Sequence, residues 1–273
     1  MKILVTGAKG MLGRDVTATL KEAGHIVIET DINNLDITNF NQSEYVIRYY
    51  RPDVVVHCAA YTNVDKAEED IEKATLINEK GTENLAKITA ERDIPIVYIS
   101  TDYVFDGEGC RPYKPHDCKN PISVYGKTKS AGEDAIEKFC KKYYILRTSW
   151  LYGHNGKNFV ETIINLLQTK PEIKVVDDQT GCPTWTMELA RIIKKTIDNE
   201  LDYGIYHICG SGQTTWYGFA CKIAEFMNLN TPIYPCTTEE FPRPAKRPSY
   251  SVMDNLGLCS NWEDALKEYI EKR

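Results

Sequence analysis

A tyrosine and a lysine that could act on one ligand stand four residues apart in the stretch PISVYGKTKSAGE, residues 121–133. Residues four apart on a helix share a face, so the Tyr125 phenol and the Lys129 ammonium could reach the same site. A nearby cation lowers the pKa of a tyrosine toward the working pH, which makes the phenol a proton donor to a carbonyl under reduction. With 17 tyrosines in the chain, chance alone predicts about one such pair. The pair therefore indicates a catalytic site only together with other motifs upstream in the chain.

A group of polar residues, Ser100, Thr101 and Asp102, follows the apolar run IPIVYI, which predicts a strand. Ligands of parallel sheets lie beyond the carboxyl ends of the strands, so the Thr101 hydroxyl would point toward a cleft. A turn or a helix cap explains these residues equally well. Chance hardly explains all three motifs in this order: a glycine turn, then Thr101, then the pair of Tyr125 and Lys129.

The glycine-rich turn TGAKGMLG joins the opening strand to a helix predicted over residues 11–23. Gly7, Gly10 and Gly13 permit a tight turn and let backbone N–H groups approach a pyrophosphate at the helix N-terminus. The spacing G-x-x-G-x-x-G departs from the commoner G-x-G-x-x-G. We expect a dinucleotide here, with a purely structural turn as the alternative.

An acidic residue, Asp31, follows the second predicted strand, HIVIET, and Asp36 lies slightly further on. A carboxylate near this point accepts hydrogen bonds from the adenosine ribose and repels a 2′-phosphate, which favours NADH. Arg14 would instead attract a 2′-phosphate, and Asp31 could simply be a turn residue. The sequence therefore leaves the preference between NADPH and NADH open.

Strands and helices alternate in the first half of the chain. We expect strands at KILVTG, HIVIET, DVVVHCAA, IPIVYIST and YYILRTSW, and helices over residues 11–23, 72–93 and 123–143. Within the second helix, Asn78 could interrupt backbone hydrogen bonding, although a polar helix surface explains it as well. This order predicts an α/β fold, a doubly wound parallel sheet of the Rossmann type, over residues 1–150.

The second half has amphipathic helices over residues 158–168, 187–201 and 216–229, a short final helix, and one strand at GIYHICGSG. These elements make no sheet large enough to stand alone. We therefore expect a smaller substrate-binding lobe over residues 151–273, some of whose segments could return to the first domain, with the binding cleft between the two parts.

Composition narrows the class of protein. No apolar run approaches the ~18 residues that cross a bilayer, and the chain opens as a strand, so we expect a cytoplasmic protein without a membrane partner. The nine cysteines form no C-x-x-C pair, which indicates reduced packing residues and no metal site. A net charge of -6 with scattered lysines argues against nucleic acid as a partner.

Taken together, these motifs resemble the extended short-chain dehydrogenase/reductase family. Within it, they are similar to the dTDP-4-dehydrorhamnose reductases along nearly the full length, in AAYTNVDKAE, STDYVFDG, YGKTKSAGE, RTSWLYG, DDQTGCPTW and RPSYSVMDN. The resemblance implies a sugar-nucleotide substrate, reduced at C4 from dTDP-4-dehydro-L-rhamnose to dTDP-L-rhamnose by NADPH or NADH, in the synthesis of a cell-surface polysaccharide precursor. Two alternatives stay open: a non-catalytic NADP-binding subunit similar to that of methionine adenosyltransferase, and another sugar-nucleotide epimerase or reductase.

The same resemblance assigns residues by position. The catalytic set is Thr101, Tyr125 and Lys129, and Asp102 and Trp150 match sugar-contacting positions, although Trp150 could equally be a core residue. Cofactor-binding positions are Gly7, Gly10, Met11, Leu12, Gly13, Asp31, Asp36, Ile37, Ala59, Ala60, Tyr61, Tyr125 and Lys129. In the late proline-rich run, Arg243, Arg247 and Tyr250 could hold the nucleotide diphosphate, because guanidinium groups bind phosphate in bidentate fashion.

Some members of the family are similar in binding a magnesium ion through acidic residues at a dimer contact. Asp15 and Glu188 lie in the corresponding segments, but the full acidic set is not matched. We therefore predict no metal site, and the resemblance leaves both Mg²⁺ and a homodimer open.

Overall fold

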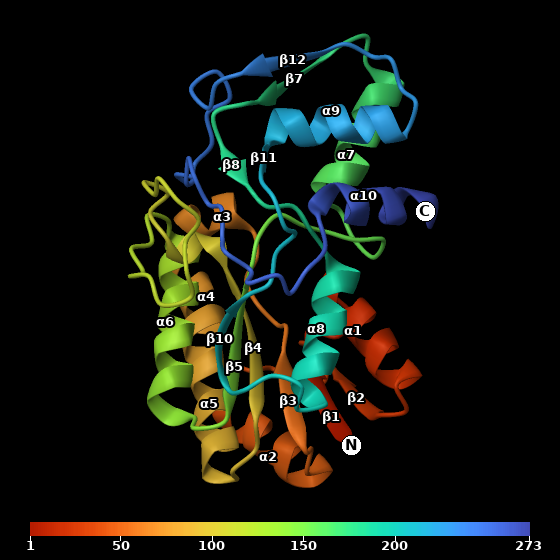
Figure 1. Cartoon of the computed structure of the whole chain (residues 1–273). Helices are drawn as coiled ribbons and strands as arrows, with labels where there is room; N and C mark the ends of the chain where they lie inside the picture. Colours follow the sequence, from red (N-terminus) through yellow and green to blue (C-terminus); the bar gives the residue numbers. More distant parts are fainter.

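Six parallel strands form the central sheet of the protein, whose computed structural model describes all 273 residues (Figure 1). In chain order the strands are β1 (Lys2–Thr6), β2 (Ile26–Thr30), β3 (Val54–His57), β4 (Ile96–Thr101), β5 (Tyr143–Thr148) and β10 (Gly204–His207). They lie side by side in the order β10-β5-β4-β3-β1-β2. The chain therefore builds outward in opposite directions from β1, which confirms the predicted doubly wound α/β fold.

Both faces of the sheet are covered by helices. In β1, Ile3 and Val5 join one apolar cluster while Leu4 joins another, because alternate side chains of a strand point to opposite faces. The first cluster packs under α1 (Met11–Glu22) and α8 (Thr186–Ile197). The second packs under α2 (Phe40–Tyr50), α5 (Thr82–Glu91) and α6 (Val124–Phe139). Strands β3 and β4 are consequently buried along their whole length.

The helix predicted over residues 72–93 is one continuous rod with an irregular middle. It consists of α4 (Ile71–Thr75), a π-helical segment η1 (Leu76–Gly81) and α5, and the shorter α3 (Val64–Glu69) precedes it. The π-helical turn contains Asn78, the residue expected to interrupt backbone hydrogen bonding. Such turns arise where a helix gains one residue and often accompany functional sites.

A smaller lobe stands above the carboxyl ends of the strands. Its helices are α7 (Phe159–Thr169), α9 (Trp216–Phe226) and α10 (Trp262–Glu271), which enclose a separate apolar core of 16 buried residues. Three short strand pairs complete it: β6 (Leu151–Tyr152) with β9 (Thr184–Trp185), β7 (Ile173–Val176) with β12 (Ile233–Cys236), and β8 (Thr180–Gly181) with β11 (Thr214–Thr215). None of the helices in the protein has the length and apolar character needed to cross a bilayer.

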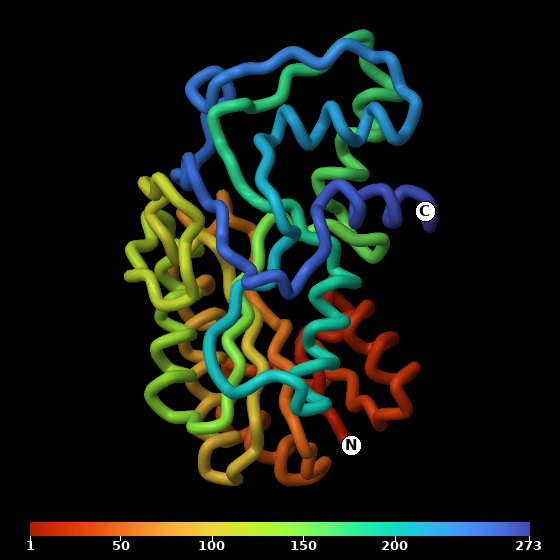
Figure 2. The backbone as a smooth tube through the Cα atoms, in the orientation of Figure 1, coloured from red at the N-terminus to blue at the C-terminus, as the bar shows by residue number.

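Two segments from beyond residue 150 belong to the central sheet layer. Helix α8 lies against α1, and β10 pairs with β5 as the edge strand. The path of the chain in Figure 2 shows this return: the backbone leaves the sheet after β5, enters the lobe, comes back through α8 and β10, and then rises again to the C-terminus. The two parts are thus joined by several crossings of the chain.

The packing of α8 on the sheet generates a stability prediction. Ile193 on α8 is fully buried in the cluster that also contains Val16 and Leu20 of α1. We expect Ile193→Ala to lower the free energy of unfolding by about 2–5 kcal/mol, because it removes apolar contacts and leaves a cavity. Urea denaturation measures this, with Lys195→Ala, an exposed change on the same helix, as the control. A loss below about 1 kcal/mol would show that α8 is not part of this core.

Candidate active site

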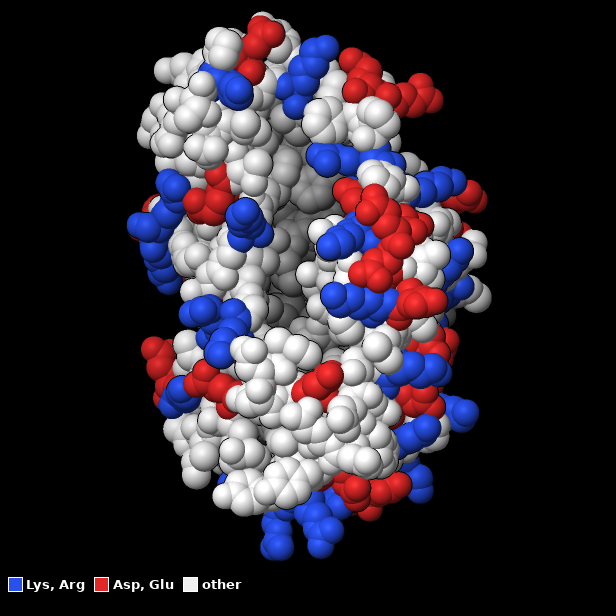
Figure 3. Space-filling model, turned by 180° about the vertical axis from the view of Figure 1, so that it is seen from behind, with Lys and Arg blue, Asp and Glu red and all other residues white.

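A cavity of about 860 Å³ lies at the carboxyl ends of β1, β3, β4 and β5. This is the point where the strand order reverses, the place at which doubly wound sheets bind ligands. The surface in Figure 3 is hollowed along its middle, and Lys and Arg side chains stand on both walls of the hollow. The cavity thus lies between the sheet and the smaller lobe, as predicted for the binding cleft.

One end of the cavity is formed by the glycine turn. A Cβ atom on Gly13 would lie 2.2 Å from the Gly7 carbonyl oxygen, so only glycine allows the helix to start this close to the turn. Gly10 is the N-cap of α1 and supplies no side-chain hydrogen bond, which leaves the first N–H groups of the helix available. With Met11 and Leu12 also lining the cavity, the turn fits a dinucleotide pyrophosphate.

Acidic and apolar residues line the cavity beyond β2. The Asp31 carboxylate forms an ion pair with Lys9 at 2.8 Å and accepts a hydrogen bond from the Asn33 N–H group. These contacts, Lys9 first, lower the pKa of Asp31. Asp36 and Ile37 line the same end.

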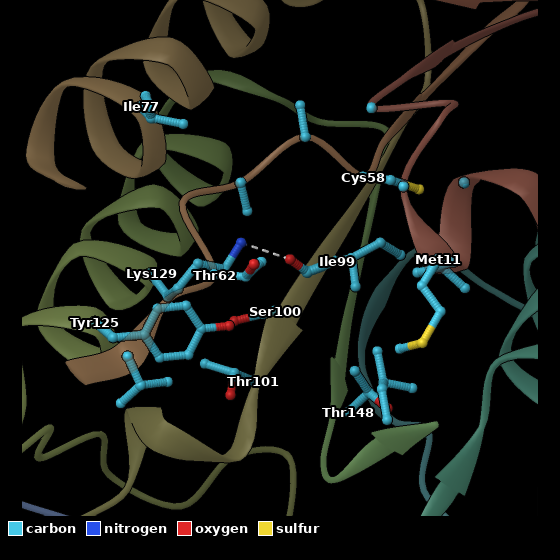
Figure 4. Close-up of a pocket in the computed structure, with 18 of the residues that line it drawn as sticks. Met11, Cys58, Thr62, Ile77, Ile99, Ser100, Thr101, Tyr125, Lys129 and Thr148 are labelled. Carbon is cyan, nitrogen blue, oxygen red and sulfur yellow. Dashed lines mark hydrogen bonds between the residues drawn. The ribbon is translucent and has the colours of Figure 1, made fainter. Parts of the chain in front are cut away.

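The predicted catalytic residues Thr101, Tyr125 and Lys129 all line the cavity (Figure 4). Helix α6 begins after Ser123, whose side chain accepts a hydrogen bond from the Gly126 N–H group at 3.1 Å. A Cβ atom on Gly126 would lie 2.1 Å from the carbonyl oxygen of Tyr103, so the helix packs closely on the turn after β4. This contact places the α6 side chains against the end of β4.

The Lys129 side chain is 2% exposed and is held by two contacts. Its Nζ atom donates a hydrogen bond to the Ile99 carbonyl at 2.6 Å and lies 4.0 Å from the centroid of the Tyr98 ring. Burial lowers the pKa of Lys129 to about 7, although Glu133 acts in the opposite direction. Lys129 therefore changes charge near neutral pH in this structure.

The Tyr125 ring points toward the end of β4, and its edge meets Tyr103 at a centroid distance of 5.5 Å. Burial raises the pKa of the Tyr125 phenol to about 12; Thr101 opposes this rise and Asp102 adds to it. The expected lowering by Lys129 is therefore absent from this structure. Two features account for this: the Lys129 Nζ atom donates to the Ile99 carbonyl, and Lys129 loses its charge near pH 7, below the range in which the phenol ionises.

Two buried polar atoms in the cavity have no hydrogen-bond partner, Oδ2 of Asp102 and Oγ1 of Thr148. The other Asp102 oxygen accepts a hydrogen bond from the Thr101 hydroxyl at 3.0 Å, and burial raises the pKa of this carboxyl to about 6. Ser251 lies close enough to lower the pKa of the Asp102 carboxyl against the effect of burial, and the binding of a ligand by either atom stays a prediction.

Trp150 lines the cavity from the segment after β5. Its φ of 47° is left-handed, an unusual backbone conformation for a large side chain. The indole stacks on Trp216 of α9 with ring centroids 3.5 Å apart. Trp150 thus packs on the lobe and also lines the cavity, and its contact with a sugar stays a prediction.

The stretch from Ala59 to Tyr61 is fixed by Asn78. The Asn78 side chain accepts a hydrogen bond from the Tyr61 N–H group at 2.7 Å and donates to the Tyr61 carbonyl at 3.1 Å. It also donates to the Thr128 hydroxyl of α6. Ala59 and Ala60 line the cavity, whereas Tyr61 does not.

Three other predicted residues, all in the late proline-rich run, lie outside the cavity lining. Arg247 forms a two-bond ion pair with Asp65 of α3, at 3.0 and 2.9 Å. Arg243 is exposed and lies over the Phe241 ring, and Tyr250 packs beside Tyr113. Their assignment to the diphosphate therefore stays a prediction.

Two lysines of the cavity lining, Lys73 and Lys157, were not predicted. Both are exposed, and neither forms an ion pair with a carboxylate. Lys157 follows Gly156, whose position lies next to the Met11 side chain at the glycine turn. Neither lysine belongs to a recognisable motif, so only the fold shows that they reach the cavity.

The acidic residues considered for magnesium are engaged elsewhere. The Asp15 carboxylate accepts hydrogen bonds from Thr186 and from Asn155, and Glu188 binds the backbone and hydroxyl of Ser260. No three His, Cys, Asp or Glu side chains gather closely enough to hold a metal ion.

A dinucleotide turn on β1, with Thr101 on β4 and a Tyr-x-x-x-Lys pair on α6 in one cavity, defines an extended short-chain dehydrogenase/reductase that uses a nicotinamide cofactor. Comparison with known families is more specific. The chain belongs to the RmlD substrate binding domain family, whose pattern matches residues 1–273.

Named relatives and solved structures are similar to this chain over its whole length. A spore coat polysaccharide biosynthesis protein, SpsK of Bacillus subtilis, is 41% identical, covering 100% of this chain and 98% of the relative. The structure of a dTDP-4-dehydrorhamnose reductase from Clostridium acetobutylicum is 48% identical with a TM-score of 0.97, covering 100% and 99% of the two chains. A Bacillus anthracis dTDP-4-dehydrorhamnose reductase in complex with NADP is 39% identical, with a TM-score of 0.96 and the same coverage.

The burial of Lys129 predicts a pH dependence of stability. Its pKa is lowered from 10.5 to about 7, so the unfolded chain carries more protons than the folded protein between these values. The Lys129 contribution to stability therefore rises with pH in this window, by up to about 1.4 kcal/mol per pH unit. We expect the melting temperature of Lys129→Met, relative to the wild type, to fall steadily from about pH 7 to about pH 9 without cofactor.

Thermal unfolding at several pH values measures this difference. Lys127→Met, which removes an exposed lysine of the same helix, serves as the control. A gap between Lys129→Met and the wild type that stays constant or grows in favour of the variant would contradict the lowered pKa.

Proposed function

We propose that the protein reduces the C4 ketone of dTDP-4-dehydro-L-rhamnose to dTDP-L-rhamnose, in the synthesis of a polysaccharide precursor. The observation that carries this proposal is the meeting of Thr101, Tyr125 and Lys129 in one cavity with the glycine turn. The dTDP-4-dehydrorhamnose reductases named above, similar over the full length, support the choice of substrate.

Most of the residues predicted to bind a nicotinamide dinucleotide line the cavity, with Tyr61 as the exception. In our proposal, the N–H groups at the start of α1 bind the pyrophosphate, and Asp31, Asp36 and Ile37 surround the adenosine. The segment Ala59–Tyr61, which Asn78 fixes, lies along the cofactor. Lys129 holds the nicotinamide ribose through its ammonium.

In our proposal, Tyr125 donates the proton. The bound nicotinamide supplies the hydride for C4 of the sugar. At neutral pH the phenol keeps its proton, because its pKa is raised to about 12, and it can donate that proton to the oxygen that gains charge. The Thr101 hydroxyl, which donates to Asp102 in this structure, would turn its proton to the same oxygen. When Lys129 is charged beside the ribose, it favours the phenolate that remains.

The rest of the cavity suits a sugar nucleotide. The unpartnered atoms of Asp102 and Thr148 would bind sugar hydroxyl groups, and Trp150 would cover an apolar face of the ring. Arg247 would bind the diphosphate if it exchanged Asp65 for a phosphate, with Arg243 and Tyr250 close in sequence. Lys73 and Lys157 are further cations for the phosphates of the two ligands.

The surroundings of Asp31 suit both forms of the cofactor. The carboxylate would repel a 2′-phosphate, but the Lys9 ammonium 2.8 Å away offsets that repulsion and can itself bind a phosphate. We propose that the protein accepts NADPH as well as NADH, and that the balance depends on this pair.

The proposed proton donor yields the first activity prediction. We expect Tyr125→Phe to lower kcat by about 10²- to 10⁴-fold, because the variant lacks the general acid. The affinity for NADPH should stay nearly the same, since the phenol hydroxyl contributes little to binding. Oxidation of NADPH, followed by absorbance with a dTDP-4-keto sugar, measures kcat, and fluorescence titration measures cofactor binding.

Wild-type activity is the reference for this experiment. A wild-type protein that binds NADPH but reduces none of several keto-sugar nucleotides would favour the non-catalytic subunit. Turnover in Tyr125→Phe equal to that of an active wild type would remove Tyr125 from the mechanism and leave the reductase assignment intact.

A second prediction concerns the cofactor. We expect Asp31→Asn to raise the ratio of kcat/KM for NADPH to that for NADH by about tenfold, because the variant no longer repels a 2′-phosphate. Lys9→Met should move the ratio in the opposite direction. Steady-state kinetics with both cofactors decides; equal ratios in all three proteins would exclude the pair from cofactor selection.

A further inference from the structure

A buried ion pair lies directly behind the catalytic end of the sheet. The Glu133 carboxylate of α6 is fully buried and accepts hydrogen bonds from Nε and Nη2 of Arg147 at 2.8 and 2.7 Å. Arg147, on β5, is 2% exposed, and its Nη1 atom donates to the Pro115 carbonyl at 2.9 Å. The pair does not line the cavity, and the proposed reaction does not use it.

The ion pair connects the two elements that carry the reacting groups, α6 and β4, with the neighbouring strand β5. Glu133 is one helical turn beyond Lys129 and two beyond Tyr125, so all three side chains project from the same face of α6. Its Oε1 atom also accepts a hydrogen bond at 2.5 Å from Ser100, the residue before Thr101. Arg147 pairs in register with Ser100 across the two strands. One carboxylate therefore binds α6, β4 and β5 together.

Other contacts also hold α6: the Tyr98 hydroxyl of β4 donates to the Lys129 carbonyl at 3.3 Å, and Asn78 donates to the Thr128 hydroxyl. At its N-terminus, α6 is fixed by the Ser123 cap and by the close approach of Gly126 to the turn after β4. Further along the helix, Lys129 donates to the strand at Ile99 and Glu133 binds Ser100, so the helix is fastened to β4 on both sides of Lys129. Among these contacts, the Glu133 contact is the one made by a charged and fully buried side chain.

Because Glu133 and Arg147 are buried, their ion pair is stable only when both side chains are correctly placed. Burial alone would raise the pKa of Glu133, but Arg147 and Lys119 outweigh it, so the pKa is lowered and the group stays ionised. An ionised pair away from water needs near-ideal geometry, because misplaced partners do not recover the cost of desolvation. The pair consequently has one favourable arrangement, which favours one position of α6 on the strands.

We propose that Glu133 and Arg147 are positioning residues for the reduction: together they hold the helix that carries Tyr125 and Lys129 at a fixed position on the strand that ends at Thr101. This inference rests on the function proposed above. Neither residue touches the ligands; both act through the groups that do.

Glu133 has a second effect, on the charge of Lys129. The titratable groups that face Lys129 are Tyr125 and Glu133 on its own helix, Tyr98 on β4, and His57 and Cys58 at the end of β3. Glu133 is the carboxylate among them, and it favours the charged lysine. Loss of its charge would allow Lys129 to lose its proton at a lower pH.

Three variants test the proposal. Glu133→Gln removes the charge, and Arg147→Lys keeps a charge but loses the two-bond contact. Either single change leaves a buried group imperfectly paired and could impair folding. The double variant Glu133→Gln with Arg147→Gln leaves no unpaired charge, so it keeps the test valid if the single variants do not fold. Glu161→Gln is the matched control, because Glu161 forms a two-bond pair with Arg273 on the surface of the lobe.

We expect kcat to fall about 10- to 100-fold in Arg147→Lys and in the double variant, since small displacements of reacting groups cost factors of this size. The dissociation constant for NADPH, from fluorescence titration, should change less than about threefold, because the glycine turn is remote from the pair. The alkaline limb of the pH profile of kcat/KM should move down by about one pH unit in both variants without the carboxylate, and stay in place in Arg147→Lys. Glu161→Gln should behave as the wild type.

The outcomes separate this inference from the function on which it rests. A wild-type protein that reduces no keto-sugar nucleotide would refute the proposed function itself. An active wild type with a folded, NADPH-binding double variant of equal kcat and unchanged pH profile would refute the positioning role. A fall in kcat that only mirrors a loss of folded protein, seen by thermal unfolding, would also overturn it.

Discussion

Parallel pairing of the strands is the constraint on which the active site depends. Because β1, β3, β4 and β5 run in one direction, their carboxyl ends meet at one edge, and residues far apart in the chain come together there. The glycine turn, the Ala59 segment, Thr101 and Thr148 each follow the end of a different strand. Among the proposed catalytic residues, Tyr125 and Lys129 come from a helix, and they reach this edge because α6 packs closely on the turn after β4.

The cost of burying polar groups shapes the region around this edge. A lysine, two carboxylates and an arginine are each at most 2% exposed, which proteins tolerate only where contacts compensate. Lys129 has the Ile99 carbonyl, Glu133 has Arg147 and Ser100, and Asp102 has Thr101 on one oxygen alone. The groups with complete sets of contacts give the site its geometry, and Asp102, in the cavity lining, has one oxygen that lacks a full hydrogen bond.

Much of this arrangement could be predicted from local sequence, since it follows from local physics. Apolar runs gave the strands, glycine positions gave the dinucleotide turn, and helical spacing placed Tyr125 and Lys129 on one face. Helix α2 was not predicted, because its exposed side includes Tyr45 and Tyr49 and blurs the apolar period. The rotamer of Lys129, the Asp65 partner of Arg247 and the place of Lys157 depend on contacts distant in sequence, which spacing alone does not contain.

The repeated crossing of the chain between the sheet and the lobe has a consequence for evolution. Because α8 and β10 complete the sheet layer from within the second half, a recombination break near residue 150 would strip the sheet of an edge strand and uncover α1. Residues 151–273 therefore do not form a unit that can be separated from the sheet. An exchange of the lobe between two such proteins would therefore have to include α8 and β10 as well.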